Sequence, residues 1–90
     1  MTFDEAVNRL IQGLPKYESY FPHHIGNAIT YLCDDLRFSN VMRAYNSIRA
    51  LLSIPGVALN DESKFARCQI LVLLGESEAA LMSKFYGKKS

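Results

Sequence analysis

Apolar side chains recur every three or four residues along most of this 90-residue chain, and no other feature restricts its fold as strongly. Such spacing places these side chains on one face of an α-helix. Thr2, with Glu5 three residues later, is a capping box, and Gly13 and Pro15 are stop signals. We therefore predict a first helix from Thr2 to about Gly13. Its apolar stripe comprises Phe3, Ala6, Val7, Leu10, Ile11 and Leu14.

The same spacing predicts four more helices. Ser39 is a candidate N-cap for the third, and Asn60 or Asp61 for the fourth. Pro55-Gly56 is expected to end the third helix, and Gly75 to break the chain between the fourth and the fifth. Leu52 and Phe85 are placed on inward stripes, whereas Phe21 is placed off them. The predicted ranges are 23–36, 39–54, 61–74 and 77–86.

The predicted fold class is all-α, with about five antiparallel helices in helix–turn–helix pairs. A strand over 69–74 is rejected because no second β-rich run exists to pair with it. A chain of this length can bury one core, so 1–90 is predicted to be one domain. Its expected parts are an N-terminal helix with an aromatic linker (1–22), a first helix pair (23–54), a second helix pair (61–86) and a flexible tail (87–90).

Composition argues against several classes of protein. The formal net charge is +1, so no strong overall field attracts nucleic acid or an anionic membrane. The longest apolar run, 70–74, is far shorter than the ~18 residues of a membrane span. The first residues lack a secretory leader pattern, and a cytoplasmic location is expected. Cys33 and Cys68 are predicted to be small buried apolar residues.

Catalytic and metal chemistry is not indicated by the motifs. Adjacent residues on a helix diverge by about 100°, so His23 and His24 cannot easily share a metal ion. The adjacent acids Asp34 and Asp35 are interpreted as a solvated surface. We find no glycine-rich phosphate loop and no nucleophile motif. The sequence thus predicts no catalytic, cofactor or metal site and a protein that is not an enzyme.

Nucleic-acid binding is a less favoured alternative. Arg37, Arg43 and Arg49 are six residues apart. This spacing turns successive side chains by about 240°, so they form no single stripe on a helix. The lysines near the C-terminus are interpreted as compensation for the helix dipole and as solubilising charge.

Two helix pairs in succession resemble the tetratricopeptide repeat. In the second pair, Cys68, Leu71, Gly75 and Ala80 stand at the offsets where that repeat has its small, apolar and turn residues. Lys64 and Arg67 depart from it, because they stand at positions where the repeat has large apolar residues. In the first pair the corresponding positions are Ile29, Leu32, Leu36 and Val41.

Among repeat proteins of this size, the chain resembles the needle-subunit co-chaperones of type III secretion systems. The segment 24–32, and 65–68 leading into Leu74-Gly75-Glu76, carry this resemblance. It implies a protein that pairs with a smaller helical co-chaperone and clamps an amphipathic helix of the needle subunit.

The fourth predicted helix is apolar on almost every side, which indicates a central position or a partner. If the pairs stack as repeats, two lanes form one shallow groove suited to a helix. The lane of the first pair contains His23, Gly26, Asn27, Thr30 and Cys33. The predicted partner-binding residues are Phe65, Ala66, Gln69, Val72 and Leu73 from the second pair, with Asn27 and Thr30 from the first.

The predicted function is a non-catalytic module that shields an amphipathic helix of another protein, alone or as a homo- or heterodimer. One alternative is structural: Val72 and Leu73 belong to the core. The other is functional: a small regulatory or inhibitory protein of phage or plasmid type that acts as a homodimer on a nucleic-acid enzyme.

Overall fold

The computed structural model describes residues 1–34 and 37–87, with side chains through Lys84, and contains no strand within them. Four α-helices account for most of these residues: α1 (Phe3–Gly13), α2 (Pro22–Asp34), α3 (Phe38–Arg49) and α4 (Asp61–Gly87). Short 3-10 helices at Pro15–Tyr17, Ala50–Ser53 and Gly56–Ala58 occupy the connections. The all-α prediction is confirmed at this level.

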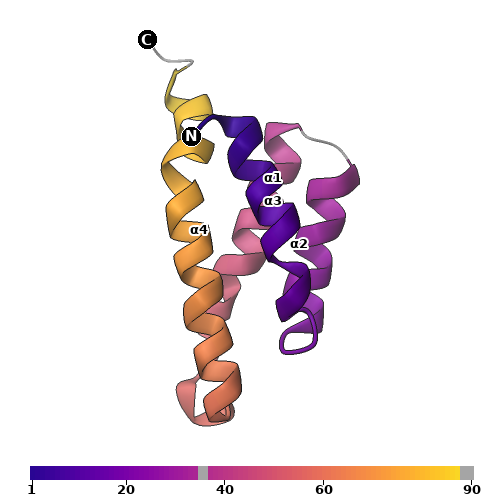
Figure 1. The fold of residues 1–90 in the computed structure, drawn as a ribbon, viewed down its shortest axis with the longest axis vertical. Helices are drawn as coiled ribbons and strands as arrows, with labels where there is room; N and C mark the ends of the chain where they lie inside the picture. Colours follow the sequence, from indigo (N-terminus) through magenta and orange to yellow (C-terminus); the bar gives the residue numbers. More distant parts are fainter. Residues whose placement is uncertain (35–36, 88–90) are drawn as a thin grey trace.

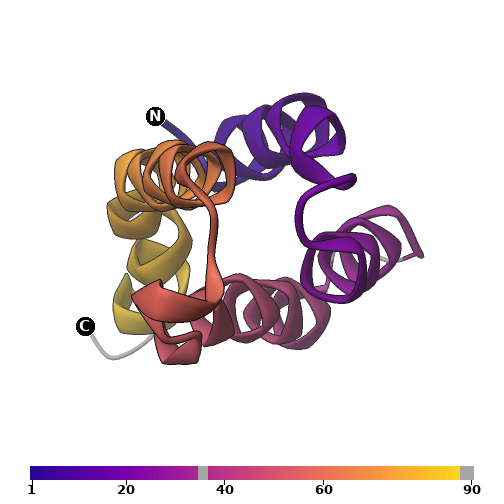
Figure 2. The ribbon, with the colours of Figure 1, turned by 90° about the horizontal axis from the view of Figure 1, so that it is seen from below.

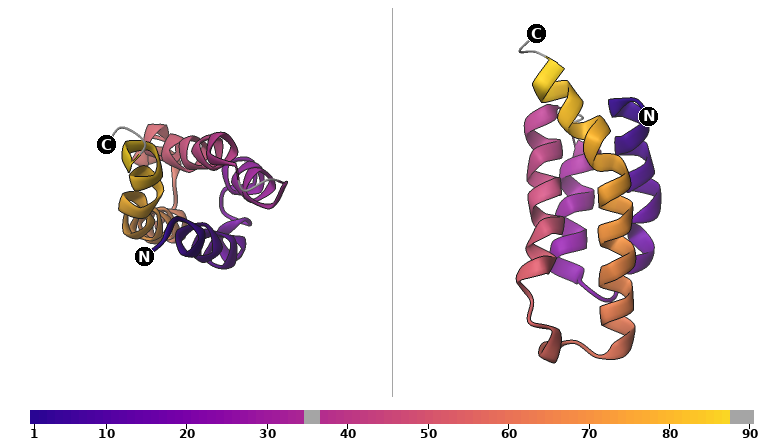
Figure 3. Two further views of the ribbon diagram at one scale, coloured as in Figure 1. Left: turned by 90° about the horizontal axis from the view of Figure 1, so that it is seen from above. Right: turned by 90° about the vertical axis from the view of Figure 1, so that its left-hand side faces the viewer.

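The four helices form an antiparallel bundle in which each helix packs against its neighbours in the chain (Figure 1). Seen along the bundle, they stand at the corners of a square (Figure 2). α1 and α4 close the square side by side, so α2 lies diagonally opposite α4. α4 is the longest helix, and its first turns extend beyond the ends of α1 and α2 (Figure 3).

Two helix starts follow the sequence prediction. Thr2 Oγ1 accepts a hydrogen bond from the Glu5 N–H, and Glu5 Oε1 accepts one from the Thr2 N–H, both at 3.1 Å. This capping box satisfies two amide groups that lack a partner inside the helix. At α4, Asn60 Oδ1 accepts from the Ser63 N–H at 2.8 Å. Asn60 rather than Asp61 therefore caps that helix.

The core lies on the axis of the square and receives apolar side chains from all four helices. Ile25, Ala28 and Leu32 recur at helical spacing and form the buried stripe of α2. Phe21 was predicted to lie off the inward faces, but it is buried. Leu52 was predicted to face inward, but it is largely exposed because the α-helical spacing ends at Arg49 and a 3-10 turn follows.

The predicted break at Gly75 is wrong. α4 runs without interruption from Asp61 to Gly87, so the chain has one long helix where a second helix pair was expected. The buried residues of α4 explain this: Ala66, Ile70, Leu74, Ser77 and Leu81 keep one helical register across Gly75. A glycine lowers helix stability by about 1 kcal/mol relative to alanine, which burial of this stripe readily exceeds.

Other boundaries differ by a few residues. α2 begins at Pro22, and Ser39 lies inside α3, whose N-cap position is Arg37. Gly87 belongs to α4 rather than to the expected tail. Asp35, Leu36, the Phe85 side chain and the rest of the tail (88–90) lie outside the described residues, and the predictions made for them stay predictions.

Arg67 occupies a position where the repeat pattern has a large apolar residue, and the structure gives it a definite role. Its guanidinium donates to the carbonyl oxygens of Ile54 at 2.6 Å and Leu51 at 3.4 Å. These carbonyls lie at the end of the 3-10 turn after α3, where the Leu51 carbonyl also accepts from the Ile54 N–H at 3.2 Å. Arg67 thus fastens the α3–α4 connection to α4.

Candidate functional site

The antiparallel seam between α1 and α4 carries the strongest features of the surface. A side chain of α4 packs directly on α1 at Gly13, where a Cβ atom would lie 2.7 Å from Leu73 Cδ2. Beside this contact Arg9 forms an ion pair and hydrogen bond with Glu76. Because these two residues are far apart in sequence, the pair fixes the alignment of the first helix against the last.

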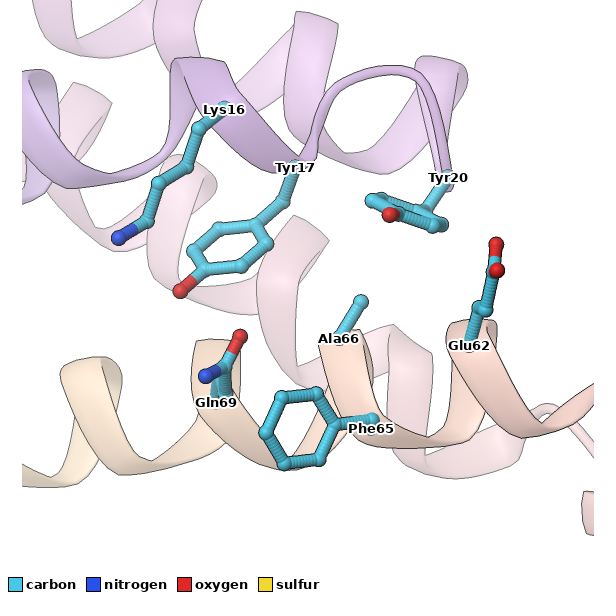
Figure 4. Close-up of a pocket in the computed structure, with 7 residues that line it drawn as sticks. All are labelled: Lys16, Tyr17, Tyr20, Glu62, Phe65, Ala66 and Gln69. Carbon is cyan, nitrogen blue, oxygen red and sulfur yellow. The ribbon is translucent and has the colours of Figure 1, made fainter.

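One hollow lies where the α1–α2 linker meets the start of α4, with a volume of about 390 Å³. Tyr17 and Tyr20 come from the linker and face α4 across it (Figure 4). The ammonium group of Lys16 lies 5.1 Å from the centre of the Tyr17 ring. The lining residues are Lys16, Tyr17, Tyr20, Glu62, Phe65, Ala66 and Gln69.

A second, more apolar hollow of about 440 Å³ continues along the same seam. It shares Phe65 and Gln69 with the first, so the two make one groove, called here the α1–α4 groove. About four turns of α4, from Glu62 to Glu76, form one wall, a length of about 21 Å. The second hollow is lined by Arg9, Phe65, Cys68, Gln69, Val72, Leu73 and Glu76.

The structure brings together all five partner-binding residues predicted on α4. Phe65 is 65% exposed and Val72 is 59% exposed, although both are large apolar residues. Gln69 is also exposed, Leu73 is half-buried and Ala66 is buried. Val72 is therefore a surface residue, whereas Leu73 lines the groove on one side and packs against the core on the other.

The two predicted residues of the first pair lie elsewhere. Asn27 and Thr30 are exposed on α2, on the opposite corner of the bundle from α4 (Figure 2). The Thr30 hydroxyl donates to the Gly26 carbonyl oxygen at 2.9 Å. The two lanes are not adjacent, because the expected stacking of a second helix pair is replaced by the single helix α4.

Sequence reasoning missed the contribution of α1 and the linker to the groove. Arg9, Lys16 and Tyr20 form its other wall, although they are more than 40 residues from Phe65 in the chain. Tyr20 carried a usable signal, since three aromatic residues crowd the linker between two prolines. Arg9 reaches the groove only because α1 packs against α4 in the folded bundle, and no local sequence pattern indicates that contact.

The other flank of α4 faces α3 through a polar contact. The Tyr45 hydroxyl donates to Glu78 Oε2 at 2.7 Å and accepts a longer contact, 3.5 Å, from Arg49. Burial raises the pKa of Tyr45, and the hydrogen bond to Glu78 raises it further because ionised tyrosine would face a carboxylate. A third hollow lies beside this contact, between Arg49, Leu52, Leu71 and Gly75.

The remaining candidates for chemistry are dispersed. His24 Nδ1 lies 3.1 Å from the Ser47 carbonyl oxygen and joins α2 to α3, whereas His23 is exposed. Cys33 and Cys68 are exposed free thiols, so the prediction that they are buried is wrong. Across 1–34 and 37–87, we find no group of three acidic, histidine or cysteine residues placed to hold a metal ion.

Comparisons with protein-family models, with curated proteins and with solved structures found no significant match. Within the described part of the chain, no helix is both long enough and apolar enough to cross a lipid bilayer. The residues of the chain itself, above all those of the α1–α4 groove, are therefore the basis for inferring a function.

Proposed function

We propose that this protein is a non-catalytic binding module that takes an amphipathic helix of another protein into the α1–α4 groove. The observation that carries the proposal is the exposure of Phe65 and Val72, about two helical turns apart on one groove wall. Large apolar residues that stay in water without a structural reason mark interaction surfaces when they cluster.

The groove also suits a helix in its length and its edges. An amphipathic helix anchors itself through apolar residues spaced three, four and seven apart, and a wall of about four turns is long enough to receive them. Gln69, Arg9 and Glu76 provide polar groups at the rim. Such groups set the orientation of a bound segment more than its affinity.

The proposed test is affinity capture from the native cells, followed by identification of the bound protein and of the segment that contacts the groove. That segment is then synthesised with a fluorescent label. We expect the peptide to become helical and to bind the wild type, and we expect Phe65→Ser with Val72→Ser to weaken binding at least tenfold. This double variant should remain folded, because neither side chain is part of the core.

The matched control changes the other predicted lane, with Asn27→Ala and Thr30→Ala. Because α2 lies diagonally opposite α4, this control should bind the peptide like the wild type. Equal binding by the groove variant and the wild type would refute the proposed site. Loss of binding in the α2 control would instead support a surface that includes the first lane.

A secretion co-chaperone, cytoplasmic and of the tetratricopeptide type, remains the finer proposal for this binding activity. The support for this finer proposal comes from the antiparallel α2–α3 pair and from the groove. The second helix pair gives no support, because residues 61–87 form one helix. If it holds, the captured partner is a secreted subunit with an amphipathic C-terminal helix. A captured nucleic-acid enzyme would favour the regulatory alternative.

A further inference from the structure

α4 carries a second apolar stripe on the side that faces away from the core. Its members alternate at spacings of three and four residues, which is the pattern of a coiled-coil seam. None is charged, although the outer face of a bundle helix is ordinarily polar. We call this stripe the outer seam; it comprises Phe65, Cys68, Val72, Gly75, Ala79 and Met82.

The outer seam is open to solvent. All its residues are exposed except Met82 at its end, which is half-buried and also packs against the core. In the right-hand view of Figure 3, α4 stands at the front of the bundle, and no other described helix covers its outer side. The space at Gly75 is also open, since no atom outside its own helix lies within 4 Å of the position that a Cβ would take.

The acidic residues on the two flanks of the seam are already held by the chain itself. Glu76 is paired with Arg9 on the α1 side. Glu78 accepts the hydrogen bond from Tyr45 on the α3 side. Both carboxylates therefore already have a partner within the chain, which lowers the electrostatic cost of placing an apolar helix beside them.

The order of side-chain sizes along the seam indicates what covers it. The large residues Phe65 and Val72 stand in its first half, and the small residues Gly75 and Ala79 stand in its second half. Reversing the seam about its midpoint, between residues 73 and 74, sets the large Val72 over the open notch at Gly75, whereas the two outer pairs join residues of similar size. The facing pairs are then Val72 with Gly75, Cys68 with Ala79, and Phe65 with Met82 of a second copy.

A parallel arrangement lacks this match. It would place every residue against itself, so Phe65 would meet Phe65 and Gly75 would meet Gly75. One layer would be overfilled and another would be left with a void, and both are unfavourable. In the antiparallel arrangement Gln69 comes beside Glu76 of the other copy, where an amide can donate to a carboxylate without opposing two like charges.

We propose that two copies of this protein associate through antiparallel packing of their outer seams around a twofold axis. This inference goes beyond the proposed function, because it concerns the free protein and stands whether or not a partner helix exists. Since Phe65 and Val72 line both surfaces, the second copy and a partner helix exclude each other. Self-association thus covers the binding surface until a partner displaces one copy.

The dimer should be weak. One pair of helices in contact over about 26 Å buries less than the roughly 800 Å² per partner of a standard interface. We therefore expect monomer and dimer to exchange at concentrations of about 10–100 µM.

The first test is sedimentation of the purified chain over this concentration range. The key variant is Gly75→Gln, which fills the notch that receives Val72 while adding a good helix former at an open position. We expect at least a tenfold weaker dimer with no loss of monomer stability. The matched control Asn27→Gln places the same side chain on the outer face of α2 and should dimerise like the wild type. A wild type that stays monomeric throughout would overturn the proposal, as would a dimer that is unaffected by Gly75→Gln.

The second test fixes the register by oxidation with copper phenanthroline in a Cys33→Ser background. In the proposed register the two Cys68 residues are offset by about 16 Å along the helices, too far for a disulfide. Adding Ala79→Cys places a thiol opposite Cys68 of the other copy, and a covalent dimer should form rapidly. Rapid cross-linking through Cys68 alone would establish the parallel arrangement, and no cross-link in the double variant would contradict the register. Neither test uses a partner protein, so a negative result in both would leave the proposed binding of a partner helix untouched. Equally, a failure to find a partner helix would leave the proposed dimer untouched.

Discussion

α1 and α4 lie side by side, run antiparallel and bury equivalent apolar stripes, yet their outer faces differ completely. The outer face of α1 carries Asp4, Asn8 and Gln12, all polar and exposed. The corresponding face of α4 carries Phe65, Val72 and Ala79. Folding accounts for the inner stripe of each helix but requires nothing of its outer face. The apolar outer face of α4 therefore indicates an interaction surface, whereas the polar outer face of α1 needs only solvent.

The largest expected effect tests the equivalence of the two inner stripes. Leu10→Ala in α1 and Ile70→Ala in α4 both empty fully buried positions. We expect each to lower the free energy of unfolding by about 2–4 kcal/mol, measured by urea denaturation. Val72→Ala, on the outer face of α4, is the control and should change it by less than about 0.5 kcal/mol. If Val72→Ala matched Ile70→Ala, the outer face would be part of the core.

The next effect concerns the flank by which α4 is attached to α3. Tyr45→Phe removes the hydrogen bond to Glu78 and should lower the free energy of unfolding by about 1 kcal/mol at neutral pH. Because the pKa of Tyr45 is raised in the folded protein, its contribution is complete below the ordinary tyrosine value and is lost as pH rises through the folded pKa.

The measurement is thermal denaturation of wild type and Tyr45→Phe from pH 8 to pH 12. The two curves should begin to approach each other above the ordinary tyrosine pKa and converge only as the pH passes the raised pKa of folded Tyr45. An unchanged difference at high pH would show that the hydrogen bond to Glu78 is not formed in solution.

A smaller effect compares the two glycines on the facing helices. Gly75 lies in the interior of α4 with open space around it, so Gly75→Ala should raise the free energy of unfolding by about 0.5–1 kcal/mol. At Gly13 a new methyl group would collide with Leu73, which must move aside and offset the gain. Thermal denaturation should therefore show a higher melting temperature for Gly75→Ala than for Gly13→Ala. The reverse order would contradict the close approach of α1 and α4.

The smallest expected change in stability is at the centre of the outer seam. Val72→Gln replaces an exposed apolar side chain by a better helix former, so the free energy of unfolding should stay within about 0.5 kcal/mol of the wild type. Binding of a helical peptide and self-association should both weaken. If Val72→Gln bound the peptide and self-associated like the wild type, the outer face of α4 would be no more an interaction surface than the polar outer face of α1.

Local signals in the sequence were sufficient for most of the fold. The capping box at Thr2 and the cap at Asn60 were predictable because each interaction spans three residues. The stripes of α1, α2 and α3 follow directly from helical periodicity. Gly75 was misinterpreted because glycine was weighed as a local breaker, whereas the register that continues from Ile70 through Ser77 to Leu81 decides the matter.

The candidate site was only half predictable. Phe65 and Val72 were recognisable because α4 has more apolar residues than one core-facing stripe can use. The wall formed by Arg9 and Lys16 depends on contacts between the two ends of the chain, which no local pattern encodes. Asn27 and Thr30 were assigned to the groove through the repeat alignment, and the single long helix separates them from it.

The anchoring of Arg67 to the carbonyl oxygens of Leu51 and Ile54 divides α4 into two parts with different dynamics. Beyond this point the helix is held by the bundle on two sides. Before it, the first turn of α4 projects past the other helices and has few buried contacts. Amide hydrogens of that turn should exchange with solvent through local fraying, while those from Ile70 to Leu81, along the buried stripe, should exchange only when the whole bundle opens. Phe65 lies on the fraying side of this boundary, so one end of the groove can change shape without disturbing the core.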